Sequence, residues 1–206
     1  MKALPKPAAG HARRAFFALL VLVGVSFAAP ADERGAPVAD DAAPLFHPVY
    51  GVLTHPRCVN CHTITEFPRQ GMDRHPHLFR VMRGAGDQGA AGARCATCHQ
   101  AQNQTASGVP GALHWRLAPL AMAWEREPGV PMTEAELCRR LLDKTRNGDR
   151  NLAQLEAHMD VEPLVRWAWS PGGDAAQQPR AWPPISHEAF MRSFRAWTAA
   201  GAPCPE

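Results

Sequence analysis

Cys58-Val59-Asn60-Cys61-His62 and Cys95-Ala96-Thr97-Cys98-His99 are two copies of one five-residue pattern. In each copy a histidine directly follows the second of two cysteines that stand three positions apart. On a helical turn, thiols at this spacing lie on the same side. The pattern is the one that attaches a c-type haem: the two thiols add to the vinyl groups of one porphyrin, and the histidine binds the iron.

The two motifs therefore predict two covalently bound haem c groups. We expect Cys58, Cys61, Cys95 and Cys98 to hold the porphyrins, with His62 and His99 as the proximal iron ligands. A zinc site or a redox-active dithiol would also use paired cysteines. Both alternatives leave the histidine after the second cysteine unexplained, and they do so twice.

The motifs belong to a longer repeat with a period of 37 residues. At this shift Arg57-Cys58 falls on Arg94-Cys95, Gly71 falls on Gly108, and His77 falls on His114. A duplicated haem-binding unit explains the coincidence. A haem iron in an electron carrier usually has a sixth ligand, His or Met, and the repeat singles out His77 and His114 for that role. The sequence leaves open whether each serves the haem of its own unit or that of its neighbour.

Other side chains compete for the sixth position. His55 and His75 lie close to the motifs, but neither recurs in the repeat. His158 follows an apolar helical pattern, which favours a packed or surface histidine. A methionine ligand on one haem is an open alternative to two histidine pairs, although methionine at such positions more often fills the core. The candidates are Met72, Met82, Met122, Met132 and Met159.

Residues 1–31 have the pattern of a cleaved signal peptide. Lys2, Lys6, Arg13 and Arg14 precede an apolar run over 15–29, which is short for a membrane span. An uncleaved N-terminal anchor is the alternative. Covalent haem attachment in bacteria takes place outside the cytoplasm on an unfolded chain, so we expect Sec-type export to the periplasm in spite of the Arg13-Arg14 pair. Residues 32–44 carry few large apolar side chains and predict a disordered linker.

The net charge changes sign when this segment is set aside. The whole chain carries +3, but removal of the four basic residues of 1–31 leaves 18 basic against 19 acidic residues. A nucleic-acid ligand is not expected at this charge. No later stretch is apolar for long enough to span a membrane, so we expect no membrane span after cleavage.

The fold class expected is mainly α, with little or no sheet. The chain has 20 prolines and 16 glycines, and both residue types are poor in strands. We expect a duplicated diheme-binding region over 45–118, rich in loops, packed with a small helical part over 119–206 as one compact domain. Capping signals at Thr133 and Ser186 start two of the helices. Further helices are expected over 152–159 and 163–169, and the six tryptophans are expected in core and haem-edge packing.

Cys138 and Cys204 are left over after the haem motifs. In an oxidising compartment we expect them to form a disulfide that ties the helix after Thr133 to the C-terminal tail. Two free buried thiols are the alternative.

The motifs place the chain among diheme c-type cytochromes. The stretch over 55–205 also resembles a family of small bacterial proteins labelled as isoquinoline 1-oxidoreductase subunits. That resemblance implies an electron-transfer partner of a molybdenum hydroxylase; nothing here matches molybdopterin or iron–sulfur ligation. The diheme small subunit of periplasmic nitrate reductase is similar within the haem units alone. The residues that carry the first likeness are 75–81 (His-Pro-His-Leu-Phe-Arg-Val), 108–111 (Gly-Val-Pro-Gly), 115–119 (Trp-Arg-Leu-Ala-Pro) and 201–205 (Gly-Ala-Pro-Cys-Pro).

We therefore expect an exported diheme cytochrome that passes electrons between a periplasmic oxidoreductase and the respiratory chain. On this view the chain has no catalytic residues of its own and works as an electron-transfer subunit. The alternative is a diheme peroxidase-like enzyme in which one iron keeps an open position. The matched pair His77 and His114 disfavours that alternative.

Overall fold

The computed structural model describes residues 43–206. The signal peptide expected over 1–31, and residues 32–42 of the expected linker, lie outside the described residues. Of the described residues, 39% are in helices and 11% in strands. None of the helices in this part of the chain is both long enough and apolar enough to cross a membrane.

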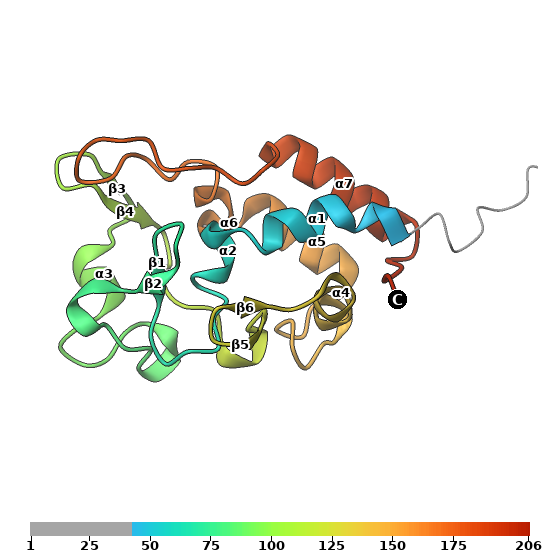
Figure 1. Ribbon diagram of the computed structural model, residues 1–206, viewed down its shortest axis with the longest axis horizontal. Coiled ribbons are helices and arrows are strands. Elements are labelled where there is room, and N and C mark those ends of the chain that lie inside the picture. Colours follow the sequence, from blue (N-terminus) through green and yellow to red (C-terminus); the bar gives the residue numbers. More distant parts are fainter. Residues whose placement is uncertain (1–42) are drawn as a thin grey trace, which may run out of the picture. The chain divides into compact units, whose positions relative to one another are not determined.

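Four helices lie together on one side of the described part of the molecule (Figure 1). They are α1 (His47–Leu53), α4 (Glu134–Leu142), α5 (Leu152–Val161) and α7 (His187–Ala199). Helix α1 contacts α4 and α7, and α5 contacts α7 and the short α6 (Pro163–Trp167). Full burial of one large apolar side chain stabilises a fold by roughly 1.5–3 kcal/mol. The core between the helices is made by Phe46, Val49, Val52, Leu137, Leu155, Met159, Phe190, Phe194 and Trp197.

Capping side chains start these helices, as the sequence predicted for two of them. Thr133 and Glu136 form a capping box at α4, and the Ser186 hydroxyl accepts from the backbone N–H of Ala189 at α7. A second capping box, from Asn151 and Gln154, starts α5. Helix α5 ends before Pro163, because the residue ahead of a proline is pushed out of the helical conformation.

Helix α1 was not predicted. Its buried residues Val49, Val52 and Leu53 have the i, i+3, i+4 spacing of one helix face, and Pro48 lies in its first turn. The helix precedes the first haem motif in the sequence, yet it packs on α4 and α7. The helical part therefore uses residues from both sides of the repeat region.

The predicted fold class, mainly α with little or no sheet, was wrong, because the described residues also form three two-stranded antiparallel sheets. In each hairpin a glycine with positive φ lies between the strands, at Gly71, Gly108 and Gly129. Each strand has only one partner, so its other edge tolerates a proline that cannot donate a hydrogen bond. The prolines and glycines, from which we predicted little sheet, are thus compatible with short hairpins. The pairs are β1 (Arg69–Gln70) with β2 (His75–Pro76), β3 (Gln102–Gln104) with β4 (Val109–Ala112), and β5 (Glu125–Glu127) with β6 (Val130–Pro131).

The sequence repeat is visible as a structural repeat. The motif helix α2 (Pro56–Val59) is followed by the β1–β2 hairpin, and α3 (Cys95–Cys98) is followed by the β3–β4 hairpin. The repeated glycines Gly71 and Gly108 have φ of 73° and 67° in the two turns. Single 3-10 turns complete the described elements, at Ala43–Leu45, Leu78–Arg80, Ala85–Asp87 and Leu120–Met122.

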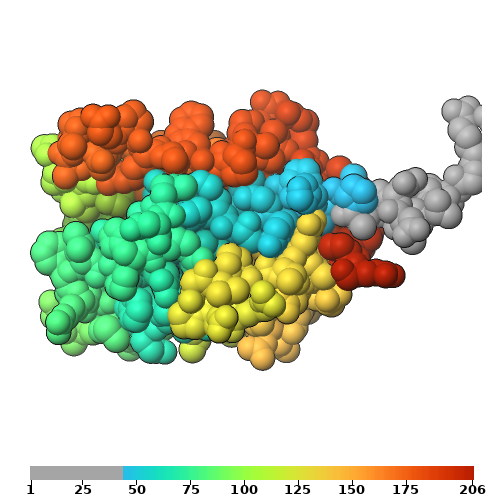
Figure 2. All heavy atoms as spheres, viewed as in Figure 1, coloured from blue at the N-terminus to red at the C-terminus, as the bar shows by residue number. Residues whose placement is uncertain are grey.

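The segment between α6 and α7 runs back along the second repeat unit (Figure 2). Its Ser170 carbonyl accepts from Asn103 Nδ2 at 2.8 Å, and Gln177 Nε2 donates to the Thr105 carbonyl at 2.5 Å. The Arg180 guanidinium also donates to the carbonyl of Gly108 in the β3–β4 turn. These bonds attach the second unit to the helical part.

The expected disulfide between Cys138 and Cys204 is present. It joins α4 to the C-terminal tail across 66 residues of sequence. The Trp197 indole N–H donates to the carbonyl of Pro203 at 2.9 Å, so the tail is also held by α7. Both sulfurs lie beside the helical core.

Replacing both cysteines, Cys138→Ala with Cys204→Ala, is expected to lower the free energy of unfolding by about 4 kcal/mol, because the bridge removes the closure entropy of a 66-residue loop from the unfolded chain. Urea unfolding of the mature protein measures the loss. Wild-type protein treated with a reductant is the matched control and should lose a similar amount. An unchanged unfolding midpoint, or two titratable thiols in the denatured unreduced protein, would contradict the bridge.

Candidate haem sites

Both cysteine motifs form the same turn of helix. The His62 N–H donates to the carbonyl of Cys58 at 3.0 Å, and the His99 N–H donates to the carbonyl of Cys95 at 2.9 Å. All four motif cysteines are free thiols. The expectation that each thiol pair lies on one helical turn is confirmed.

Each motif histidine is oriented by a backbone carbonyl. His62 Nδ1 lies 2.8 Å from the carbonyl oxygen of Met122, and His99 Nδ1 lies 2.7 Å from that of Pro110. A carbonyl can only accept a hydrogen bond, so Nδ1 carries the proton in both rings. This leaves the lone pair on Nε2, as metal-binding histidines require.

A tryptophan stacks on each of these imidazoles. The His62 and Trp124 ring centres lie 3.5 Å apart with an interplanar angle of 8°, and those of His99 and Trp115 lie 4.3 Å apart at 4°. The stacking and the carbonyl bond together fix each ring in one orientation. The expectation of packed tryptophans is wrong for Trp182, which is 61% exposed.

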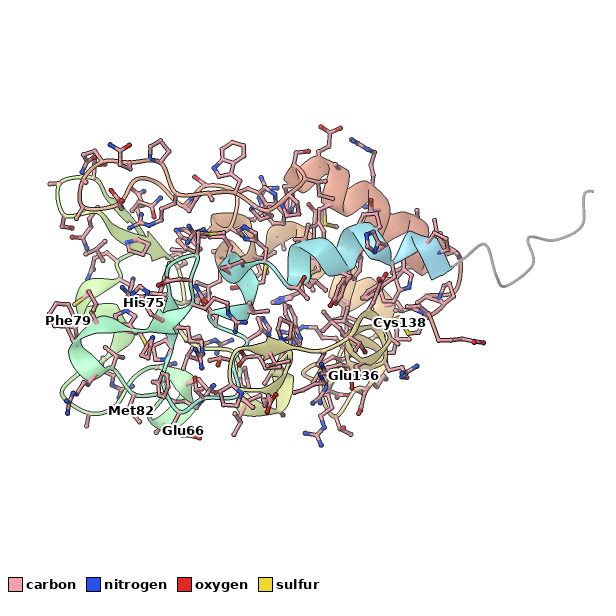
Figure 3. The ribbon with its side chains drawn as sticks, in the orientation of Figure 1. Glu66, His75, Phe79, Met82, Glu136 and Cys138 are labelled. Atoms are coloured by element: carbon pink, nitrogen blue, oxygen red, sulfur yellow. A yellow bond between two sulfur atoms is a disulfide. The ribbon has the colours of Figure 1, made fainter. Side chains whose placement is uncertain are left out.

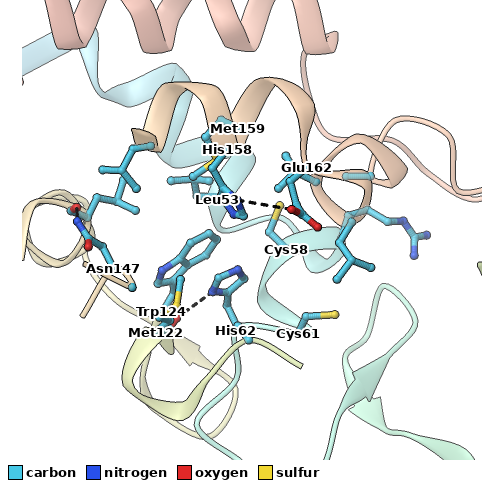
Figure 4. Close-up of a pocket in the computed structure, with 18 of the residues that line it drawn as sticks. Leu53, Cys58, Cys61, His62, Met122, Trp124, Asn147, His158, Met159 and Glu162 are labelled. Atoms are coloured by element: carbon cyan, nitrogen blue, oxygen red, sulfur yellow. Dashed lines mark hydrogen bonds and ion pairs between the residues drawn. The ribbon is translucent and has the colours of Figure 1, made fainter. Parts of the chain in front are cut away.

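A partly open cavity of about 270 Å³ lies beside the first motif (Figure 4). Cys58, Cys61 and His62 all line it. The volume lies just below the range for small-molecule sites, roughly 300–1,000 Å³. The walls are largely apolar, as a porphyrin face requires, and include Val52, Leu53, Trp115, Trp124, Leu141, Leu155, Met159, Val165, Trp167 and Phe190.

Arginines supply the positive charge around this cavity. Four of them line it: Arg57, Arg116, Arg146 and Arg150. Within residues 43–206 no ion pair joins any of the four to a carboxylate. Burial, and next the charge of Arg180, lower the pKa of Arg57. A haem carries two propionates at one edge, and unpaired guanidinium groups are suitable partners for them. The side chains that line the first cavity therefore fit the chemistry of the group that its cysteines predict.

The second motif faces His77. The ring centres of His77 and His99 lie 5.9 Å apart at an interplanar angle of 72°. His77 Nδ1 lies 2.6 Å from the carbonyl oxygen of Leu78, so both rings have Nε2 free. His77 and His99 are thus near enough to one another that both could hold the iron of a haem bound at the second motif.

The other histidines named from the sequence lie in different surroundings. His114 does not line the first cavity; its side chain is 69% exposed, and Nδ1 lies 3.9 Å from a carboxylate oxygen of Glu162. His55 caps α2, since its Nδ1 accepts from the backbone N–H of Arg57. His75 Nδ1 contacts Asp73 at 2.7 Å. In contrast His158, which the sequence assigned to packing or the surface, lines the first cavity.

Burial controls the titration of the first motif. It raises the pKa of Cys58 to about 12 and that of Cys61 to about 11. A redox-active thiol has the opposite property, a lowered pKa. Burial also lowers the pKa of His62 to about 4, although its hydrogen bond to Met122 acts the other way. At neutral pH the imidazole is therefore in the uncharged form that binds metals.

No family model, curated protein or solved structure matches the chain. Within residues 43–206, no three His, Cys, Asp or Glu side chains form a group that could hold a metal ion. The case for haem thus depends on the chain's own residues: the motif turns, the oriented histidines and the cavity.

A buried carboxylate holds the segment directly after His62. Glu125 Oε2 accepts from the Thr63 hydroxyl at 2.6 Å and from the Ile64 N–H at 2.9 Å, and Arg74 forms an ion pair with the other oxygen. Glu125 is 2% exposed. Burial acts to raise the pKa of Glu125, but the bonds from Thr63 and Ile64 and the charge of Arg74 outweigh it, so the pKa lies below its ordinary value.

The substitution Glu125→Gln is expected to lower the free energy of unfolding at pH 7 by about 3 kcal/mol, because it leaves the Arg74 charge buried without its partner. A carboxylate whose pKa is depressed in the folded state stabilises fully above its unfolded pKa of about 4.3, and this stabilisation is lost as the pH falls through the folded value. The difference in the free energy of unfolding between wild type and variant should therefore become smaller in acid. Denaturant unfolding at several pH values measures it.

Glu127→Gln is the matched control, since Glu127 lies in the same strand but is exposed. It is expected to change stability by less than about 0.5 kcal/mol. Equal losses in the two variants, or a gap that persists in acid, would contradict the role given to Glu125.

Proposed function

We propose that this chain is an exported, periplasmic diheme c-type cytochrome that transfers electrons. The observation that carries the proposal is the duplicated turn: in both motifs the histidine N–H bonds to the first cysteine, Nδ1 donates to a backbone carbonyl, and a tryptophan stacks on the ring. A redox-active dithiol would not need a histidine that is oriented in this way. The resemblance to diheme cytochromes supports the same interpretation.

Each haem iron, when bound, takes up and releases one electron. The chain's residues do the rest. Cys58 and Cys61 bind one porphyrin, Cys95 and Cys98 bind the other, and His62 and His99 present Nε2 to the irons. His77 presents its own Nε2 beside His99. The apolar wall of the first cavity would cover the porphyrin, and its arginines would pair with the propionates.

The two sites are neighbours in the described chain. Trp115 stacks on His99 and also lines the cavity of the first motif. Three residues later, the Ala118 N–H donates to the carbonyl of Cys61 at 3.2 Å. One short segment thus touches both sites, which supports electron exchange between two haems held in this chain.

We place the contact with a redox partner at the second site. Cys98 is exposed, whereas the thiols of the first motif are half-buried and line the cavity. Next to His77, Leu78 and Phe79 are 57% and 89% exposed, and Phe79 lies at the edge of the molecule in Figure 3. The resemblance implies a molybdenum hydroxylase as the partner, with the respiratory chain on the other side of the transfer.

Matured in a bacterial periplasm, the chain is expected to carry two haems, because each motif supplies its own pair of thiols. The double variants Cys58→Ala/Cys61→Ala and Cys95→Ala/Cys98→Ala should each carry one. The alkaline pyridine spectrum and the intact mass measure the number of haems. Cys138→Ala/Cys204→Ala removes two cysteines outside the motifs and is the matched control, expected to keep both haems. A mature chain without haem would overturn the proposed function.

Carbon monoxide and cyanide distinguish an electron carrier from a peroxidase-like enzyme. We expect neither to bind rapidly to the purified wild-type protein, because the irons of an electron carrier would each be held by two protein ligands, as His99 and His77 would hold one of them. Stopped-flow absorption spectroscopy measures the binding. Rapid binding to one of the two haems would favour the diheme peroxidase-like alternative.

A further inference from the structure

The cavity of the first motif has a second histidine in its wall. His158 comes from α5, and its ring points into the cavity toward His62 (Figure 4). Its side chain is 22% exposed, in contrast to 69% for His114. Two histidines that are 96 positions apart in the sequence therefore line the same cavity.

A carboxylate lies near the His158 ring. Nδ1 of His158 lies 4.0 Å from a carboxylate oxygen of Glu162, one helical turn further on. This contact is an ion pair that is longer than a hydrogen bond. Carboxylates on the Nδ1 side are common neighbours of metal-binding histidines, which then bind the metal through Nε2.

The repeat does not supply a sixth ligand for the first haem. His77 belongs to the first unit but lies beside His99 of the second motif. The histidine of the first unit would therefore bind the haem of the second unit. His114 is the equivalent residue of the second unit, and the chain has no third motif to receive it.

The methionines of the cavity are less suitable. Met159 is 4% exposed and packs in the core between the helices. Met122 belongs to the segment whose carbonyl binds His62 Nδ1, so this segment lies beside the His62 ring rather than across the cavity from it.

We propose that His158 is the sixth ligand of the first haem, in place of His114. The two irons would then be held by His62 with His158 and by His99 with His77, and α5 would close the first site. The inference depends on the proposed function, because it requires the haem. It assigns Glu162 a positioning role, since Glu162 contacts His158 without reaching the iron.

The test compares His158→Ala and His114→Ala in the mature diheme protein. Both variants should retain two haems by the alkaline pyridine spectrum. In His158→Ala one of the two irons should become five-coordinate and bind carbon monoxide rapidly, so that half of the haem responds. His114→Ala should give the wild-type absorption and electron paramagnetic resonance spectra. His77→Ala should open the other iron, and His77→Ala combined with His158→Ala should open both.

His158→Met provides a second variant, in which a long side chain still lines the cavity from α5. One haem should then show the weak red absorption band of a Met–Fe bond, and its potential should rise, because Met raises the potential relative to His. The potential of the other haem should stay near its wild-type value.

The outcomes separate the two proposals. Loss of both haems from the wild-type chain would overturn the proposed function. Two haems with an open iron in His114→Ala, or two six-coordinate irons in His158→Ala, would overturn the assignment of His158 and leave the cytochrome in place. A Met–Fe band already present in the wild-type protein, or one wild-type iron open to carbon monoxide, would overturn the assignment as well.

Discussion

The hydrogen bond from each motif histidine to a backbone carbonyl is the interaction on which both candidate sites depend. His62 is bound to the Met122 carbonyl, and the same segment returns two further bonds, from Ala118 N–H to the Cys61 carbonyl and from Trp124 N–H to the His62 carbonyl. The chain over 118–124 is therefore attached to the first motif along its length. Helix α4 and the β5–β6 hairpin come directly after this segment, so their positions are set by the same bonds.

Local signals in the sequence predicted the motif turns, the capping of α4 and α7, and the Cys138–Cys204 pair. These features depend on a few residues at fixed spacing, or on a count of leftover cysteines. The hairpins were missed because Pro76, Pro110 and Pro131 counted against strands, although each occupies a strand with a free edge. Helix α1 was missed because its seven residues are stabilised by contacts with helices far along the chain, and its own pattern is short.

The repeat predicted which residues of the two units are equivalent, but it did not predict which side chains each of them contacts. Gly71 and Gly108 keep the same role, because a turn is a local structure. His77 and His114 differ, because the neighbour of each side chain comes from the next part of the chain: a second motif after His77, and the helical part after His114. His158 had no signal in the repeat. Its one local signal is Glu162 at i+4, which a surface helix also shows.

Under the proposed function, the same architecture makes the two sites electrostatically unequal. The first is lined mainly by apolar side chains, whereas the second has an exposed cysteine and an exposed aromatic neighbour. A ferric haem carries one more positive charge on its iron than a ferrous one. An apolar surrounding disfavours that extra charge, while water stabilises it. The haem of the first motif would therefore be the easier one to reduce, and the haem of the second motif, open to a partner, would be the one through which its electrons enter and leave.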